Sequence, residues 1–358
     1  MVVMKWGFRW YGKKGDSIPL NHVRQIPGIN GVVGTLLGKL PGEVWEISEI
    51  QELKSSVESG DLELLGIESV AVHDAIKAGT SERDYYIDNY IQTIKNLSQC
   101  GIRMICYSFK PIFGWAKTDL SFENEDGSLS LVYDQEVVDH MQASDMFKLI
   151  HSQSKGFDLP GWEEERLNKF DELVATYDGV TEEILFDNLT YFLKKIIPVC
   201  EEMDVKMAIH PDDPPYEIFG FPRITKNLED LKKILNIIDS PYNGLTLCTG
   251  SLGANPDNDM VKIIHEVGEK INFVHFRNVK FLGERKFKET AHLSSEGSLD
   301  MFAIMKALVE VGFDGVIRPD HGRTVWGEIA MPGYGLGDRA MGITYSQGLL
   351  EAIQKMKN

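Results

Sequence analysis

The chain has 358 residues, of which 43% are hydrophobic and 25% charged, and its formal net charge at pH 7 is −17. This balance is typical of a globular protein with a sizeable core, and it excludes disordered and fibrous proteins. The acidic charge and the lack of a basic run argue against a nucleic-acid partner, because a negative surface repels a phosphate backbone.

The first part of the chain alternates short apolar runs with amphipathic segments. Residues 43–59, for example, carry apolar side chains at helical spacing between Val44 and Val57. Short runs rich in β-branched and other apolar residues predict strands instead. On this basis we predict strands at residues 5–10, 31–35, 62–72 and 102–109, and helices at residues 19–26, 43–59 and 84–99.

The alternation stops between residues 110 and 179. This segment contains Trp115, an acidic turn at residues 123–127, and helical pieces around residues 134–150 and 162–177. We interpret residues 110–179 as a helical insertion after the fourth strand. Covering a site at the rim of the fold and building an interface are both open roles for it.

The remainder of the chain returns to the alternating pattern. A long helix is expected to begin at Thr181, because Glu182 and Glu183 suit the first turn of a helix. We predict this helix at residues 181–203, strands at residues 206–210, 245–248, 273–275 and 316–317, and further helices at residues 228–238, 259–268, 299–311 and 339–356.

Strands that alternate with helices predict an α/β protein with a parallel sheet, and eight such strands are the number that closes into a barrel. The predicted fold is therefore a (β/α)8 TIM barrel that forms a single domain over residues 1–358. An open doubly wound sheet is the main rival, but no Gly-x-Gly-x-x-Gly motif follows an early strand.

The last four predicted strands each end near a side chain that can ligate a metal ion. These side chains are His210, Cys248, His275 and Asp320. Taken alone, such a cysteine or histidine is more often a core residue, and an Asp after a proline is more often a turn residue. Their recurrence at strand ends that meet at one rim favours a site for a divalent ion, with Mn²⁺, Fe²⁺, Co²⁺ and Zn²⁺ all compatible.

Other residues near these strand ends suit substrate chemistry. His321 is a candidate general acid or base, since imidazole titrates near neutral pH. Tyr334 lies in a glycine-rich stretch that could bring a phenol to the site, although such stretches are also common in surface loops. Arg9 and Arg323 are candidate ligands of a carboxylate, although most arginines are simply solvated. Asn278, close after the seventh strand, is a further candidate for substrate binding.

The sequence gives no sign of a membrane or secreted location. No apolar run approaches the length of a membrane span, and the amino-terminal residues lack the pattern of a signal peptide. The four cysteines are scattered and include no Cys-x-x-Cys pair, so structural disulfides are not expected. We therefore expect a cytoplasmic protein that does not bind membranes.

Five stretches of the chain resemble the mannonate dehydratase family. They are residues 8–12 (FRWYG), 208–215 (AIHPDDPP), 248–253 (CTGSLG), 275–279 (HFRNV) and 318–323 (RPDHGR). The resemblance extends over essentially the whole chain. It implies a barrel similar to that of xylose isomerase and a hydro-lyase that uses Mn²⁺ or Fe²⁺. The implied reaction converts D-mannonate to 2-dehydro-3-deoxy-D-gluconate in hexuronate and glucuronate breakdown.

The resemblance also implies roles for individual residues. The four strand-end residues would hold the metal, and His321 and Tyr334 would transfer protons, with the order of acid and base left open. The expected partner is a small sugar acid, and a homo-oligomer is possible. The alternatives are a metal-dependent sugar isomerase with a barrel of the same type, and a sugar-acid binding protein without catalytic activity.

Overall fold

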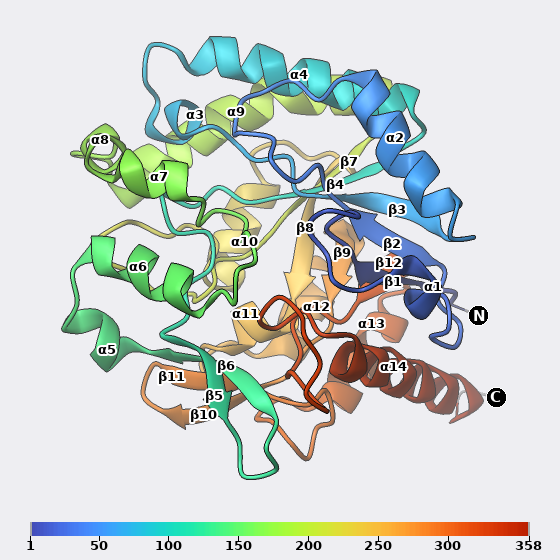
Figure 1. Ribbon diagram of the computed structural model, residues 1–358. Helices are drawn as coiled ribbons and strands as arrows, with labels where there is room; N and C mark the ends of the chain where they lie inside the picture. Colours follow the sequence, from blue (N-terminus) through green and yellow to red (C-terminus); the bar gives the residue numbers. More distant parts are fainter. Residues whose placement is uncertain (1, 357–358) are drawn as a thin grey trace.

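The computed structural model describes residues 2–356, and its central feature is a closed parallel barrel (Figure 1). The strands pair in the order β1-β12-β9-β8-β7-β4-β3-β2 around the barrel. They are β1 (Lys5–Arg9), β2 (Gly31–Gly34), β3 (Glu63–Glu68), β4 (Met104–Tyr107), β7 (Lys206–Ile209), β8 (Asn243–Cys248), β9 (Ile271–His275) and β12 (Val316–Arg318). The predicted barrel is confirmed.

The barrel strands are short apolar runs that are buried on both faces, as is usual in parallel sheets. Every residue of β2 and of β8 is buried. β3 ends at Glu68, so the predicted strand over residues 62–72 was too long. Val70 and Val72 are buried in the core as the apolar pattern suggested, but they lie beyond the last pair of the ladder, Glu68 with Cys106.

Helices surround the barrel on its outer side (Figure 1). They are α1 (Leu20–Val23), α2 (Ile47–Glu58), α3 (Asp74–Ala78), α4 (Arg83–Gln99), α9 (Glu182–Met203), α10 (Leu228–Leu235), α11 (Thr249–Gly253), α12 (Met260–Val267), α13 (Met301–Glu310) and α14 (Leu336–Met356). α9 begins as predicted, because the Thr181 side chain accepts a hydrogen bond from the Ile184 N–H at its first turn. The short helices α3 and α11 were not predicted.

The segment between β4 and α9 contains more than the predicted helices. Its elements are β5 (Asp119–Glu123), β6 (Leu129–Asp134), α5 (Gln135–Asp139), α6 (Ala143–Gln153), α7 (Glu164–Asn168) and α8 (Phe170–Thr176). The β5-β6 hairpin joins a second hairpin, β10 (Val279–Gly283) with β11 (Lys286–Glu289), in an antiparallel sheet of order β10-β11-β6-β5. This sheet lies beside the barrel at the lower left of Figure 1.

The buried apolar side chains form separate clusters that match this architecture. The largest lies between the barrel strands and the surrounding helices. A small cluster that includes Val33, Met104 and Phe273 fills the barrel interior, so the barrel is packed and is not a pore. A further cluster holds the insertion against the rim through residues such as Phe113, Phe147 and Trp162. Among the described residues, no helix combines the length and apolarity needed to cross a membrane.

Candidate active site

The four predicted metal ligands converge at one rim of the barrel. His210, Cys248, His275 and Asp320 each offer one donor atom, and these atoms all lie within 4.8 Å of one another. His210 Nε2 is 3.2 Å from His275 Nδ1, which is 3.5 Å from Asp320 Oδ1. Cys248 Sγ is 3.4 Å from Asp320 Oδ2. Such spacing suits donor atoms that share one divalent ion, because metal–ligand distances are about 2.0–2.3 Å.

The chemistry of three of these donors fits a metal ion directly. For His275, burial and Arg318 act to lower the pKa, but Glu68 and Asp320 together raise it to about 10, so this imidazole must lose a proton when an ion binds. Metal ligands must be deprotonated. Burial raises the pKa of the Cys248 thiol, but Arg277 and His275 together outweigh that effect and hold the pKa below its ordinary value, which favours the thiolate. Burial, Lys110 and His275 keep the pKa of His210 low, which favours the neutral imidazole. The two imidazoles, one thiolate and one carboxylate form a set suited to a first-row divalent ion.

Charged side chains behind the ligands hold them in place. His275 Nε2 lies 3.3 Å from Glu68 Oε2, so its Nδ1 faces the other donors. Arg318 binds Glu68 and Asp320 at the same time, at 2.7 and 3.1 Å. Arg277 Nε lies 2.9 Å from Asp320 Oδ2. Partners of this kind fix the orientation of ligands and tune their basicity.

His321 and Tyr334 are in contact beside the four ligands. His321 Nε2 lies 3.0 Å from the Tyr334 hydroxyl, and its Nδ1 lies 3.2 Å from Glu289 Oε1. Glu289 is buried and also pairs with Arg277. The pKa of Glu289 is lowered, because Arg277 and His321 outweigh the effect of burial. A carboxylate at Nδ1 requires the proton on that nitrogen, so the Nε2 lone pair faces the Tyr334 hydroxyl.

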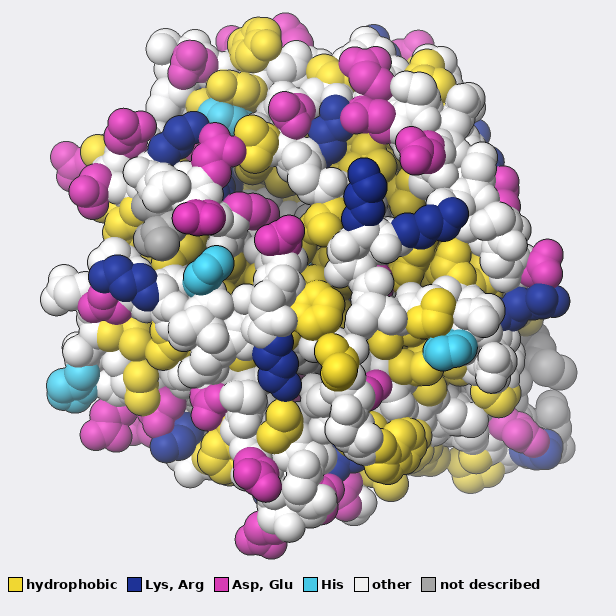
Figure 2. All heavy atoms as spheres, viewed as in Figure 1, with side chains coloured by type: hydrophobic (Ala, Val, Ile, Leu, Met, Phe, Trp, Pro, Cys, Tyr) yellow, Lys and Arg dark blue, Asp and Glu magenta, His cyan; other side chains and the backbone are white. Residues whose placement is uncertain are grey.

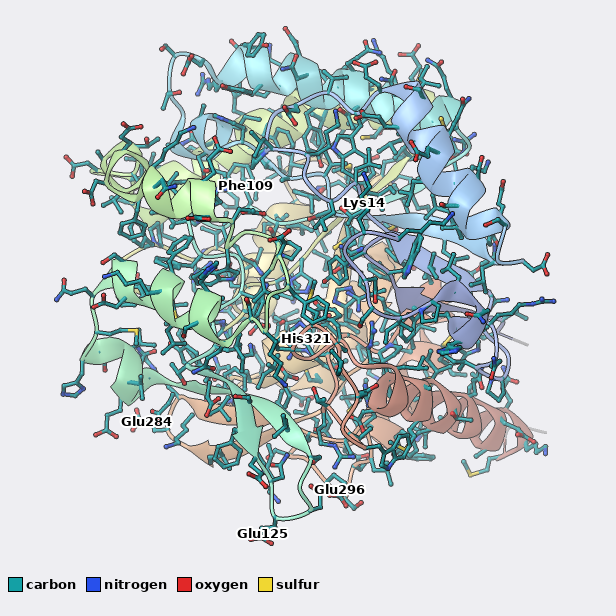
Figure 3. All side chains as sticks on the ribbon, in the orientation of Figure 1. Lys14, Phe109, Glu125, Glu284, Glu296 and His321 are labelled. Atoms are coloured by element: carbon teal, nitrogen blue, oxygen red, sulfur yellow. The ribbon has the colours of Figure 1, made fainter. Side chains whose placement is uncertain are left out.

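A cavity of about 230 Å³ opens onto these groups. Its lining includes His210, Asp320, His321 and Tyr334, together with Arg9 from the end of β1. Arg9 is buried, donates to backbone carbonyls of Trp10 and Val33, and lies over the Tyr11 ring. Figure 3 shows His321 near the middle of the view, between the insertion helices and α14. Figure 2 shows acidic side chains spread over the same face, with basic ones among them and no continuous basic surface.

Two predicted substrate ligands are not brought to this cavity. The Arg323 guanidinium binds Asp338 at 2.9 Å and Asp126 at 3.1 Å, so it joins the loop after β12 to α14 and to the turn of the β5-β6 hairpin. The Asn278 amide donates to the Leu293 carbonyl. Neither side chain lines the cavity, and the polar groups of both are engaged by the protein itself. The structure therefore gives Arg323 and Asn278 roles in loop packing.

Several site residues were missed from the sequence. Glu289 lies on β11, which is outside the barrel, so the rule that active sites form at barrel strand ends could not find it. The alternating run over residues 279–289 was a signal for the hairpin. Glu68 interrupts an apolar run that begins at Leu64, and that contrast was a usable signal. Lys110 lies in the loop after β4 and also lines the cavity.

Comparison with known proteins agrees with this site. Residues 4–358 match the family described as D-mannonate dehydratase (UxuA). The mannonate dehydratase of Enterococcus faecalis is 70% identical over 355 residues, 99% of both chains, and that of Thermotoga maritima is 53% identical over 356 residues, again 99% of both. The crystal structure of mannonate dehydratase from Streptococcus suis serotype 2 superposes with a TM-score of 0.89 at 42% identity, covering 99% of this chain and 96% of that one. These matches confirm the resemblance predicted from five short stretches, and the chain belongs to the mannonate dehydratase family.

Proposed function

We propose that this mannonate dehydratase removes water from D-mannonate in the cavity at the barrel rim, with a divalent ion held by His210, Cys248, His275 and Asp320. The observation that carries this mechanism is the contact of the cavity with both the buried donor cluster and the His321–Tyr334 pair. The product is 2-dehydro-3-deoxy-D-gluconate. We propose Mn²⁺ or Fe²⁺ as the ion, because the resemblance to the mannonate dehydratase family implies these two, whereas the donor set by itself also suits Co²⁺ and Zn²⁺.

The reaction breaks the C2–H and C3–O bonds and forms a C2=C3 double bond, giving an enol that becomes the 2-keto product. Removal of the C2 proton leaves extra negative charge next to the carboxylate, and an ion bound at the four ligands would stabilise that charge as a Lewis acid. His321 and Tyr334 lie beside those ligands, where a base must take the C2 proton and an acid must protonate the departing hydroxyl.

We assign the base to His321 and the acid to Tyr334. Glu289 holds the proton on His321 Nδ1, so Nε2 carries the lone pair. That lone pair faces the Tyr334 hydroxyl in this structure, and it accepts the C2 proton once this hydroxyl turns toward the C3 oxygen of the substrate. Burial raises the pKa of Tyr334, so its hydroxyl keeps a proton that it can donate to the C3 hydroxyl as it leaves. Arg9 stays a proposed substrate ligand, since it is a cation in the lining with no carboxylate within 4.0 Å among the described residues.

We further propose that residues 1–358 act as one barrel domain and that the insertion at residues 110–179 covers the rim. Trp115, Pro160 and Arg166 from this insertion line the cavity, where they exclude water from the reacting groups. The four cysteines are all free, which agrees with a proposed cytoplasmic location. An aldose–ketose isomerase is not favoured, because the family match extends over residues 4–358.

The test is a D-mannonate dehydration assay on chelator-treated protein, with Mn²⁺, Fe²⁺, Co²⁺ and Zn²⁺ restored separately. We expect no turnover without metal, and the highest turnover with Mn²⁺ or Fe²⁺. Neutral aldoses and ketoses serve as control substrates, because the dehydratase needs a carboxylate to acidify the C2 proton and an isomerase does not. Full turnover by the chelated protein, or isomerisation of a neutral sugar at a comparable rate, would contradict the proposal.

A further inference from the structure

Lys110 is a buried cation in the cavity lining, and the described part of the chain places no carboxylate in contact with it. It follows β4, next to Phe109, which Figure 3 labels, and it is 6% exposed. Lys77 and Lys117, which are also buried, have carboxylate partners at 2.8 Å. No carboxylate oxygen among the described residues lies within 4.0 Å of the Lys110 ammonium. A buried charge without a partner is costly, so this ammonium is poised for an anion from outside the chain.

Among the described residues, the side chain within hydrogen-bond distance of this ammonium is His210, and it does not satisfy the ammonium. Lys110 Nζ lies 3.3 Å from His210 Nδ1, which itself lies 2.7 Å from the Pro211 carbonyl oxygen. With Nε2 as the ligand atom, Nδ1 carries the ring proton and donates it to Pro211. That nitrogen then has no lone pair for Lys110, and the ammonium faces an N–H group. An acceptor has to come from the substrate.

We propose that Lys110 binds the substrate carboxylate next to His210 and so determines the preference for aldonates over neutral sugars. This inference rests on the proposed function, because it takes His210 as a metal ligand through Nε2. A carboxylate at this place would also lie between the Lys110 ammonium and the proposed divalent ion, two positive charges that would otherwise repel each other. Arg9 lies on β1, which is not adjacent to β4 in the barrel, so it is left to contact the hydroxyl groups farther along the sugar chain.

The interaction strengthens during the reaction. When the C2 proton leaves, its electron pair moves onto the carboxylate, which then carries more negative charge than in the bound substrate. A fixed ammonium stabilises this species more than it stabilises the substrate, so Lys110 contributes to kcat as well as to KM.

The experiment compares Lys110→Met with Lys14→Met, a control at the exposed Lys14 in the loop after β1, which Figure 3 labels. We expect Lys110→Met to lower kcat/KM for D-mannonate by about 100-fold, through both kcat and KM, because one charged donor is lost. Metal content per chain should equal that of the wild type. Lys110→Arg should recover part of the lost kcat/KM. The kcat/KM of Lys14→Met should stay within about twofold of the wild-type value, since exposed charges contribute little.

Inhibition constants separate carboxylate binding from other roles. D-gluconate and D-glucitol differ only at C1, where the first carries a carboxylate. We expect Lys110→Met to weaken inhibition by D-gluconate about tenfold or more and to leave inhibition by D-glucitol unchanged. Lys110→Gln replaces Lys110→Met if the latter does not fold. Equal weakening of both inhibitors, or loss of metal in proportion to activity, would overturn the proposal, because Lys110 would then position His210. The proposed function is tested apart from this, by turnover of the wild type.

Discussion

His321 is held from both sides of its ring, by Glu289 at Nδ1 and by the Tyr334 hydroxyl at Nε2. If it is the base for the C2 proton, His321→Asn should retain the metal and lose turnover by about 100-fold or more, because general base catalysis contributes this much. The measurement is kcat together with metal content per chain. His140→Asn, at an exposed helix end, is the matched control. Near-normal dehydration by His321→Asn would refute the assignment.

Glu289 is expected to act through His321, as a positioning residue. Glu289→Gln keeps the shape of the side chain but removes the charge that holds the proton on Nδ1. We expect kcat to fall about 10- to 100-fold, as for other residues that orient a reacting group, with KM nearly unchanged because Glu289 does not line the cavity.

The control for this variant is Glu296→Gln. Glu296, which Figure 3 labels, is exposed in the loop after β11. A double-mutant cycle with His321→Asn supplies the decisive readout. The effect of Glu289→Gln should disappear when His321 is already replaced, whereas a merely structural role would leave it intact.

The four predicted metal ligands and Glu289 illustrate what sequence can reveal at the scale of residues. The ligands were predictable because each follows its own barrel strand, so a local pattern recurred four times along the chain. Glu289 reaches the site from a hairpin outside the barrel, and only tertiary pairing of β11 with β6 brings it there. Arg323 lies away from the cavity for the opposite reason, because its position near a strand end says nothing of Asp338, which binds it.

At the scale of elements, Asp74 on α3 ties the barrel to the insertion helices. Its carboxylate contacts Lys77 at 2.8 Å, Arg166 at 3.1 Å and the Tyr177 hydroxyl at 2.5 Å. Asp74→Asn should lower the free energy of unfolding by about 3 kcal/mol, because it leaves buried cations without their partner. Urea unfolding measures this. As a control, Glu165→Gln breaks the exposed ion pair of Glu165 with Lys169 and should change the free energy of unfolding by about 0.5 kcal/mol or less.

The same contacts predict a pH dependence of stability. Burial acts to raise the pKa of Asp74, but Lys77 and Arg166 outweigh it and hold the pKa below its usual range. The stabilisation is therefore complete above the ordinary carboxyl pKa of about 3.9 and is lost as pH falls below it, because the unfolded chain takes up the proton first. The gap in stability between wild type and Asp74→Asn should narrow from pH 5 toward pH 3. If the difference in free energy of unfolding between the two proteins does not change with pH, the ion pairs of Asp74 are not the source of that difference.

The strands and outer helices were predicted better than the insertion, for a physical reason. Barrel strands are buried on both faces, so they appear as continuous apolar runs wherever they occur. The β5-β6 hairpin has partly exposed residues, such as Phe122 and Glu123, and its pairing partner is more than a hundred residues away on β11. The apolar side chains of this hairpin make sense only once β11 is paired with β6, and no local sequence pattern identifies that pairing.

At the scale of the whole molecule, binding of a metal should stabilise the folded protein without being needed for folding. The barrel has its own apolar core, so chelated protein should keep its helical circular dichroism. The donor cluster exists only in the native state, and an ion at 100 times its Kd adds about 2.7 kcal/mol to the free energy of unfolding. For a chain of this size, with an unfolding entropy of about 0.75 kcal/mol/K, that corresponds to a rise in Tm of about 3–4 °C.

Calorimetry on chelated protein, with Mn²⁺, Fe²⁺, Co²⁺ or Zn²⁺ added back, measures this rise in Tm. Cys248→Ala should abolish it, because the variant lacks the thiolate that Arg277 favours in the cluster. Cys100→Ala removes another buried, free cysteine, at the end of α4 and far from the rim, and should keep the full rise. If Cys248→Ala responds to the ions as the wild type does, the stabilising ion binds elsewhere. The four strand ends would then not form the metal site, and the mechanism built on them would fail with it.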